Sequence, residues 1–268
     1  LGIKLRTSNL FPALLTFILM NTSNLGAQAP VIDSVVAVSS QVERFGKFEC
    51  LVYLKAAVAN PYDYNEVTVQ GTFTGPGGQT VVADGFFMQD YNLNTANGIL
   101  APVGAGGFRV RFSPNETGAW SCTVKATTAA GTTTAPAQTF TCTPSANKGF
   151  VRRSAGNYFQ FDNDEQYIPV GQNVCWQNNN IYLDYKNWLG DMVANGANFY
   201  RLWMAHWGLG IEWKNNSSGF SGLKKYKQSA SYYIDWMLDY GAENNLYLML
   251  CINHHGQYST TVNPNWSE

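Results

Sequence analysis

The segment 197-ANFYRLWM-204 has the composition of a buried β-strand, and the segments around it indicate which kind of sheet it joins. A helical stripe precedes it: over residues 183–196 the apolar side chains recur on one helix face and end at Gly196. A second stripe, over 229–245, leads into another apolar run, 246-LYLMLCIN-253. With 166-QYIPVGQN-173 in front, the order is strand, helix, strand, helix, strand, which is typical of a parallel sheet covered by helices.

Residues 31–145 follow a different pattern. Short runs rich in β-branched and aromatic residues alternate with turn sequences such as 75-GPGGQ-79 and 113-SPNETG-118, and no helical period intervenes. This pattern predicts an antiparallel β-sandwich of immunoglobulin type over residues 31–145. The composition changes at the end of this stretch, so a second domain is expected over residues 146–268.

The first 29 residues have the features of an export signal. Lys4 and Arg6 form a positive start, residues 10–20 an apolar core too short to span a bilayer, and a polar stretch of small residues follows. Cleavage is expected after Ala27. The predicted location is therefore secreted, periplasmic or at the cell surface, with no membrane segment in the mature form.

Charge and composition exclude several classes of function. The 268 residues are 45% hydrophobic and 13% charged, which indicates a well-packed globular protein. Seventeen basic residues are balanced by eighteen acidic ones, and no basic run follows the first few residues, so nucleic acid is not an expected partner.

The five cysteines leave their pairing open. In an exported protein disulfides are permitted, and Cys122 could pair either with Cys142, across a predicted hairpin, or with Cys50 in another strand-like run. The hairpin pair is slightly preferred. Cys175 and Cys251 are expected to be free buried thiols, and no Cys-x-x-Cys spacing supports a zinc site.

Polar and aromatic residues gather where the three predicted parallel strands end, and loops at such ends converge on one edge of a sheet. Trp176, Trp203, Trp207 and Trp213 all lie near these strand ends, where each could face a ligand or the core. The selected candidates are, in chain order, Asn173, Trp176, Arg201, Trp203, His206, Trp207, Asn253 and His255.

Alternation along an extended chain narrows this choice. Asn253 and His255 are two residues apart and point to one face, while His254 points away; by the same rule Arg201 and Trp203 share a face. Adjacent histidines diverge and no His-x-His or His-Glu-x-x-His spacing occurs, so neither a metal nor a cofactor is predicted.

Indole rings, amides and a guanidinium together suit a carbohydrate, because sugar faces stack on the rings and hydroxyls bond the planar polar groups. The predicted partner is a carbohydrate substrate. The oligomeric state is left open.

Two segments resemble glycoside hydrolases of clan A, particularly family 5. 196-GANFYRLWMAHW-207 is similar to their second-strand pattern Gly-x-Asn-x-x-Arg, and 246-LYLMLCINHHG-256 is similar to their third strand, which ends in Asp-x-His. The resemblance implies that residues 146–268 are the first three β/α units of a (β/α)₈ TIM barrel. It also implies that Arg201 holds a nucleophilic carboxylate and that His255 contacts substrate or tunes the carboxylates. Asn253 stands where the family has Asp.

The resemblance implies a secreted hydrolase that cleaves O-glycosidic bonds with retention, using two glutamates at the ends of the fourth and seventh strands. Both would lie beyond residue 268, so the chain is expected to be an inactive N-terminal part of a longer protein with an incomplete barrel. The alternative is a non-catalytic carbohydrate-binding or surface-adhesion protein with a degenerate barrel.

Overall fold

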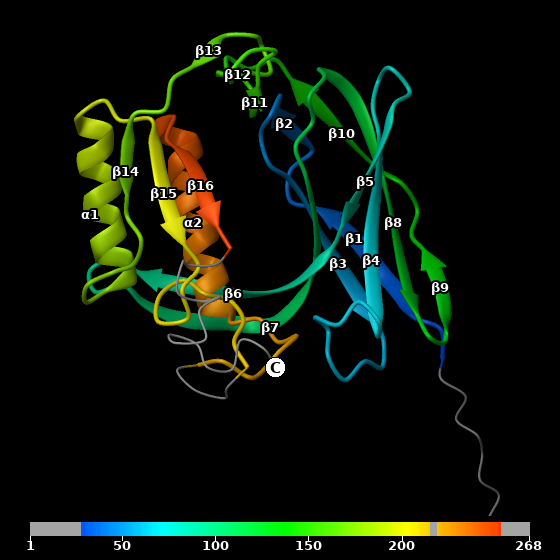
Figure 1. The fold of residues 1–268 in the computed structure, drawn as a ribbon. Coiled ribbons are helices and arrows are strands. Elements are labelled where there is room, and N and C mark those ends of the chain that lie inside the picture. The colour runs from blue at the N-terminus through cyan, green and yellow to red at the C-terminus, as the bar shows by residue number, and fades with distance from the viewer. Residues whose placement is uncertain (1–27, 215–218, 253–268) are drawn as a thin grey trace, which may run out of the picture.

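A computed structural model describes residues 28–214 and 219–252 of the chain. The described residues form sixteen strands and two helices (Figure 1). The strands fall into four sheets, of which two make a sandwich, one is a small antiparallel sheet and one is parallel. The predicted signal peptide and the predicted site residues Asn253 and His255 lie outside the described residues.

Two antiparallel sheets form the sandwich. The first has the order β1-β3-β7-β6, with the bounds Val31–Ala37 (β1), Phe48–Lys55 (β3), Ile99–Phe112 (β7) and Phe86–Asn94 (β6). The second has the order β2-β10-β8-β4-β5 with β9 beside β8, and its bounds are Gln41–Glu43 (β2), Gln138–Thr143 (β10), Gly118–Thr128 (β8), Val67–Thr74 (β4), Thr80–Asp84 (β5) and Gly131–Thr134 (β9). Short β2 runs parallel to β10, whereas the other pairs are antiparallel.

Alternate residues of the sandwich strands point into one shared core. Phe48 stacks on Phe140 with 3.7 Å between ring centroids, and Trp120 lies beside both Phe112 and Phe140. The indole N–H of Trp120 donates to the Glu116 carbonyl at 2.8 Å, so this buried polar group is satisfied. Burial of these rings is the main contribution to the stability of the sandwich.

The cysteines do not follow the preferred hairpin pairing. Along β8 and β10 Gln138 lies opposite Cys122, and Cys142 lies opposite Gly118, so the two thiols are not cross-strand neighbours. Cys122 instead contacts Cys50 of β3 across the core, and its hydrogen bond with Cys50, together with burial, raises the pKa of the Cys122 thiol. Both side chains are fully buried and their sulfurs are unlinked.

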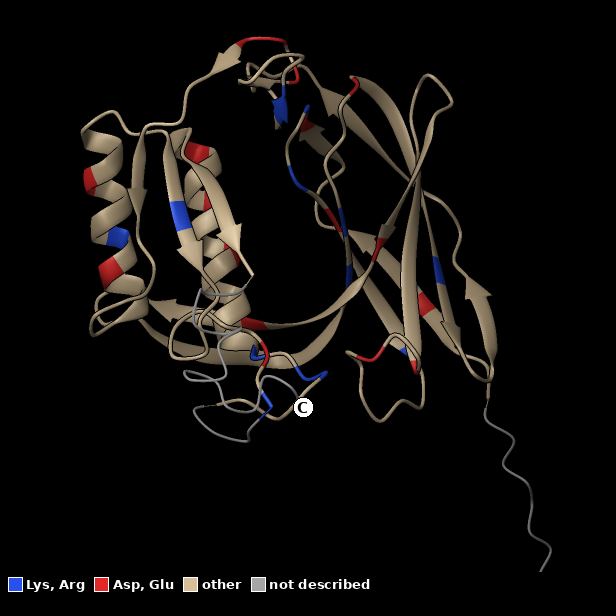
Figure 2. Ribbon diagram, viewed as in Figure 1, with Lys and Arg blue, Asp and Glu red and all other residues tan. Residues whose placement is uncertain are grey.

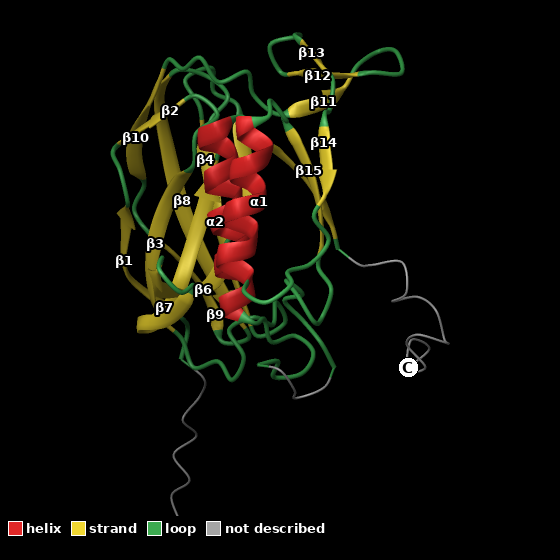
Figure 3. Cartoon of the chain, turned by 90° about the vertical axis from the view of Figure 1, so that its left-hand side faces the viewer, coloured by secondary structure: helices red, strands yellow, loops and turns green. Residues whose placement is uncertain are grey.

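The second region contains a parallel three-stranded sheet with two helices on one face (Figure 3). The sheet has the order β14-β15-β16, and its elements are β14 (Gly171–Asn173), α1 (Ile181–Ala194), β15 (Phe199–Trp203), α2 (Gln228–Asn244) and β16 (Tyr247–Cys251). Tyr200 and Leu202 of β15 are fully buried against the helices. The opposite face of the sheet carries no helix of the described residues.

The predicted fold class is wrong. The described residues are mostly strand, the parallel sheet is open at both edges, and no ring of helices surrounds a closed barrel, so an immunoglobulin-like sandwich followed by the first three β/α units of a (β/α)₈ barrel is not what the structure contains. The stretch between the two regions forms short antiparallel strands, β11 (Val151–Arg153), β12 (Phe159–Phe161) and β13 (Gln166–Tyr167), rather than a β/α unit.

One local feature explains part of this difference. The expected strand over 166–173 is divided into β13 and β14 around Pro169, which has no N–H to donate to a sheet. Helix α2 has no side-chain cap at its start, because the residue before it is Lys227, whose side chain makes no capping bond. By contrast, α1 begins at Asn180, whose side chain accepts a hydrogen bond from the N–H of Leu183 at 3.0 Å.

A long hairpin from the sandwich joins the two regions. We call the β6–β7 hairpin the arm; it leaves the sandwich and passes along the ends of α1 and α2 (Figure 1). Leu93 and Leu100, which face each other across the arm, pack into the core of the second region. At the tip, the Tyr233 hydroxyl donates to the buried Gly98 carbonyl at 2.6 Å, and the Asn180 amide donates to the Asn97 carbonyl at 2.8 Å.

A network of charged side chains supports the base of the arm. Glu49 of β3 bonds both Arg109 and Arg111 of β7, and Arg111 also bonds Asp235 of α2 at 2.8 Å. Burial alone would raise the pKa of Glu49, but hydrogen bonds and the charges of the two arginines outweigh it and lower that pKa. The carboxylate therefore stays ionised, and the network ties α2 to the sandwich.

We predict that Tyr233→Phe lowers the free energy of unfolding by about 1–3 kcal/mol, because it leaves the buried Gly98 carbonyl without its donor. Urea denaturation measures this change. The matched control is Tyr232→Phe, at the neighbouring position, where the ring contacts Tyr91. The free energy of unfolding of this variant should stay within about 0.5 kcal/mol of that of the parent. Equal losses in the two variants would contradict the role of the tip hydrogen bond.

Candidate functional site

The candidate site lies on the helix-free face of the parallel sheet, toward the carboxyl ends of its strands. Because Tyr200 and Leu202 face the helices, Arg201 and Trp203 project from the opposite face. The register places Asn173 of β14 opposite Arg201, and Cys251 of β16 opposite Trp203. The structure thus brings three strands' side chains to one place.

Arg201 is the charged residue of this face; β14, β16 and the rest of β15 are uncharged (Figure 2). Its Nε donates to the Cys251 sulfur at 3.1 Å, and its guanidinium carbon lies 5.2 Å from the centroid of the Trp203 ring. No carboxylate of the described residues lies within ion-pair distance of Arg201. The guanidinium is therefore held in place by a sulfur and an indole, and its charge is not neutralised within this part of the chain.

Tryptophans continue outward from Arg201. The Trp176 ring lies 5.6 Å from Trp203 and 5.5 Å from Trp207, measured between centroids. Trp176 and Trp207 are 40% and 42% exposed, so the outer two rings are open to solvent while Trp203 is half-buried. We call Arg201, Trp203, Trp176 and Trp207 the tryptophan rim.

The loop after β15 is folded tightly against the rim. The N–H groups of Gly208 and Gly210 both donate to the Ala205 carbonyl, at 2.9 and 2.8 Å. The Gln177 side chain, from the loop after β14, donates to the Trp207 carbonyl at 3.0 Å and joins the two loops. These bonds fix the loop that carries Trp207 relative to the one that carries Trp176.

His206 stands beside the rim. Its ring stacks on Trp213 with centroids 4.1 Å apart and an interplanar angle of 14°, and it meets the Trp207 ring edge-on at 4.7 Å. Burial lowers the pKa of His206, so the imidazole is neutral near pH 7. Its Nδ1 and the Gln177 Oε1 are buried and have no hydrogen-bond partner among residues 28–214 and 219–252.

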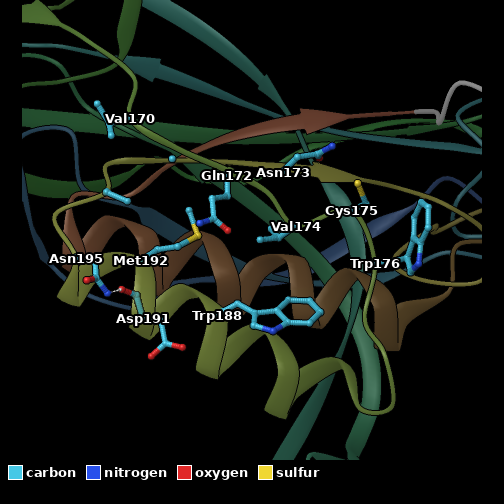
Figure 4. Close-up of a pocket in the computed structure, with 12 residues that line it drawn as sticks. Val170, Gln172, Asn173, Val174, Cys175, Trp176, Trp188, Asp191, Met192 and Asn195 are labelled. Atoms are coloured by element: carbon cyan, nitrogen blue, oxygen red, sulfur yellow. Dashed lines mark hydrogen bonds between the residues drawn. The ribbon is translucent and has the colours of Figure 1, made fainter.

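A groove of about 670 Å³ runs beside the rim, between β14 and α1 (Figure 4). Trp176 and Asn173 line it from the strand side, and Trp188, Asp191, Met192 and Asn195 line it from the helix. Among the described residues β14 pairs with a strand on one side only, and the groove lies along its unpaired side. We call it the β14 groove.

The predicted site residues divide into two groups. Asn173, Trp176, Arg201, Trp203, His206 and Trp207 do gather at one end of the parallel sheet. Asn253 and His255 lie outside the described residues. The sequence-based choice missed Gln177, whose only signal was its position one residue after Trp176. Among the described residues no cluster of His, Cys, Asp and Glu could hold a metal ion.

Comparisons with known proteins add a fold likeness and a domain match. A family described as a domain of unknown function (DUF5060) matches residues 41–127, which lie in the sandwich. A crystal structure from Bacteroides vulgatus ATCC 8482, titled "putative glycoside hydrolase", superposes with a TM-score of 0.58 at 17% identity, covering 84% of this chain and 45% of that chain. Our chain thus spans less than half of that neighbour's length. This likeness concerns the fold.

Other matches are more distant. A second crystal structure, from Bacteroides fragilis NCTC 9343, is titled "putative alpha-galactosidase/melibiase". It has a TM-score of 0.22 at 12% identity, covering 83% of this chain and 37% of that one. That score is too low to support a shared fold. No curated protein matches the sequence. Within the described residues, neither helix is long and apolar enough to span a membrane.

We predict that His206 titrates below the pKa of about 6.5 that an exposed imidazole has. The pKa of His206 is lower in the folded state than in the unfolded state. The stability that this group contributes is therefore present above its unfolded-state pKa and is lost as the pH falls toward its folded-state pKa. A pH titration of the histidine ring resonances by NMR measures it, and His206→Phe identifies the signal. A midpoint at or above that of free imidazole would contradict the burial of this ring.

Proposed function

We propose that this protein is a glycoside hydrolase that cleaves O-glycosidic bonds of a polysaccharide or oligosaccharide with retention, and that the tryptophan rim binds its sugar substrate. The observation that carries the proposal is the row of indoles, Trp203, Trp176 and Trp207, beside Arg201. The fold likeness to the Bacteroides vulgatus structure supports it.

The rim has the chemistry that a sugar needs. Indole faces pack against the C–H faces of a pyranose, and Trp176 and Trp207 are exposed enough to offer such faces. The Arg201 guanidinium supplies planar donors for a ring hydroxyl, or for a carboxylate that takes part in the reaction. The buried Nδ1 of His206 and Oε1 of Gln177 are groups that sugar hydroxyls could satisfy.

We also propose that the protein acts outside the cytoplasm, at the cell surface, in the periplasm or in the medium. The support is the charged and apolar pattern of the first 29 residues. A polysaccharide substrate is consistent with this location, because such polymers are met outside the cell.

A second candidate function is carbohydrate binding without catalysis. The observation that favours it is that Arg201 has no carboxylate partner in the part of the chain that the structure describes. An assay of the full natural gene product for release of reducing sugar from polysaccharides separates the two functions. Release supports the hydrolase, and binding without release supports the second candidate.

We predict that Trp176→Ala and Trp207→Ala each weaken oligosaccharide binding roughly tenfold, about 1.4 kcal/mol, because each removes one stacking surface. The probes are gluco-, manno-, galacto- and xylo-oligosaccharides, tested by isothermal titration calorimetry on the whole chain.

The control for these variants is Tyr158→Ala, which removes an exposed aromatic ring in the turn before β12. It should bind as the parent does. The rim would lose its proposed role if all four probes failed to bind the parent, or if both tryptophan variants bound as tightly as Tyr158→Ala.

A further inference from the structure

A second candidate site lies on the sandwich, apart from the tryptophan rim. It is a groove of about 590 Å³ between the outer face of β3 and the base of the arm, a size usual for small-molecule and sugar sites. The residues of its lining that the following paragraphs use are Asp33, Tyr53, Asp90, Gly106 and Gly107. We call it the Tyr53 groove.

Tyr53 presents an aromatic surface to this groove. Phe48, Cys50 and Val52 of β3 point into the sandwich core, so Tyr53 points outward, and it is 53% exposed. On its β7 side the strand pairing ends at Val52 and Phe108. In the described residues β7 does not pair with β3 at Tyr53, so this side of the Tyr53 side chain stays open.

The part of β7 next to Tyr53, residues 104–107, consists of three glycines and one alanine. β7 pairs with β3 through Leu51 opposite Arg109, and continuing that register places Gly107 beside Tyr53 on the same outer face. A Cβ added at Gly107 would meet nothing within 4 Å, and its φ lies outside the left-handed region, so neither packing nor backbone strain calls for glycine there. The bare strand leaves a shallow trough beside the Tyr53 ring.

The backbone around the trough is irregular. Pairing between β6 and β7 runs from Met88 opposite Gly107 to Asp90 opposite Val103, so three β7 residues stand against one on β6. Gly106 is needed there because a Cβ would lie 2.4 Å from the Phe87 ring, and Gly104 is needed for its φ of +62°. Ala105, Gly106 and Gly107 of this bulge line the groove, so a ligand can come close to the backbone there.

The polar groups at the border of the groove are balanced in charge. Asp33 pairs with Lys55 at 2.7 Å, and Asp90 pairs with Arg109, which Glu49 also holds. Both aspartates remain about half exposed, so their free lone pairs can accept hydrogen bonds from hydroxyl groups. With each carboxylate already neutralised by a cation, the groove favours an uncharged ligand.

We infer that the Tyr53 groove binds a neutral polysaccharide chain, with a sugar ring stacked on Tyr53 over Gly107 and its hydroxyls bonded to Asp33 and Asp90. The inference does not depend on the tryptophan rim. It gives the sandwich a binding function of its own, in the region that includes the DUF5060 match.

The test uses affinity electrophoresis of the whole chain in gels that contain soluble glucan, mannan, galactan or xylan. All variants are made in a Trp176→Ala, Trp207→Ala background, which removes the rim's contribution. In that background at least one polysaccharide should still retard the protein. Adding Tyr53→Ala, or Gly107→Val to fill the trough, should weaken the affinity roughly tenfold, and Tyr53→Phe should keep it, since the stacking surface remains.

Tyr158→Ala in the same background is the control and should change nothing, and thermal unfolding checks that each variant folds. The inference is overturned if the background protein is not retarded by any of these polymers, or if Tyr53→Ala and Gly107→Val are retarded as it is. Unchanged oligosaccharide binding by the single Trp176→Ala and Trp207→Ala variants, with the background protein still retarded through the groove, would contradict only the proposed role of the rim.

Discussion

The docking of the arm onto the two helices is the contact on which the arrangement of the molecule depends. A three-stranded parallel sheet with two helices buries little apolar surface, and Leu93 and Leu100 of the arm enlarge that core from outside. The hydrogen bond from Tyr233 to Gly98 fixes the tip, and the bonds of Arg111 to Glu49 and Asp235 fix the base. The sandwich therefore acts as a support for the second region.

Both candidate sites lie where part of a sheet is left uncovered. At the parallel sheet, the helix-free face leaves Arg201 and the tryptophans without a covering layer, and the β14 edge leaves a groove beside them. On the sandwich, the pairing of β7 with β3 stops at Val52 and Phe108, where β7 turns into the arm, and this leaves Tyr53 and the glycines next to it uncovered. In both places an aromatic ring lies where strand pairing stops, which is a suitable surface for a flat sugar.

Local patterns in the sequence were enough to find the helices and the rim. The stripes over 183–196 and 229–245 correspond to α1 and α2, and simple alternation placed Arg201 and Trp203 on one face. Long-range contacts could not be found in this way. Tyr233 and Gly98 are 135 positions apart, and no periodicity relates them. The expectation of barrel units failed because strand and helix alternation fixes a parallel pairing but not closure, and because Pro169 interrupts the first expected strand.

We propose above all that the tryptophan rim is a sugar-binding surface. Its most direct test is a crystal structure of the chain soaked with the oligosaccharide that binds best in calorimetry. We expect a sugar ring stacked on Trp176 or Trp207, with a hydroxyl within hydrogen-bond distance of Arg201. A sugar bound elsewhere, with these rings left in contact with solvent alone, would contradict it.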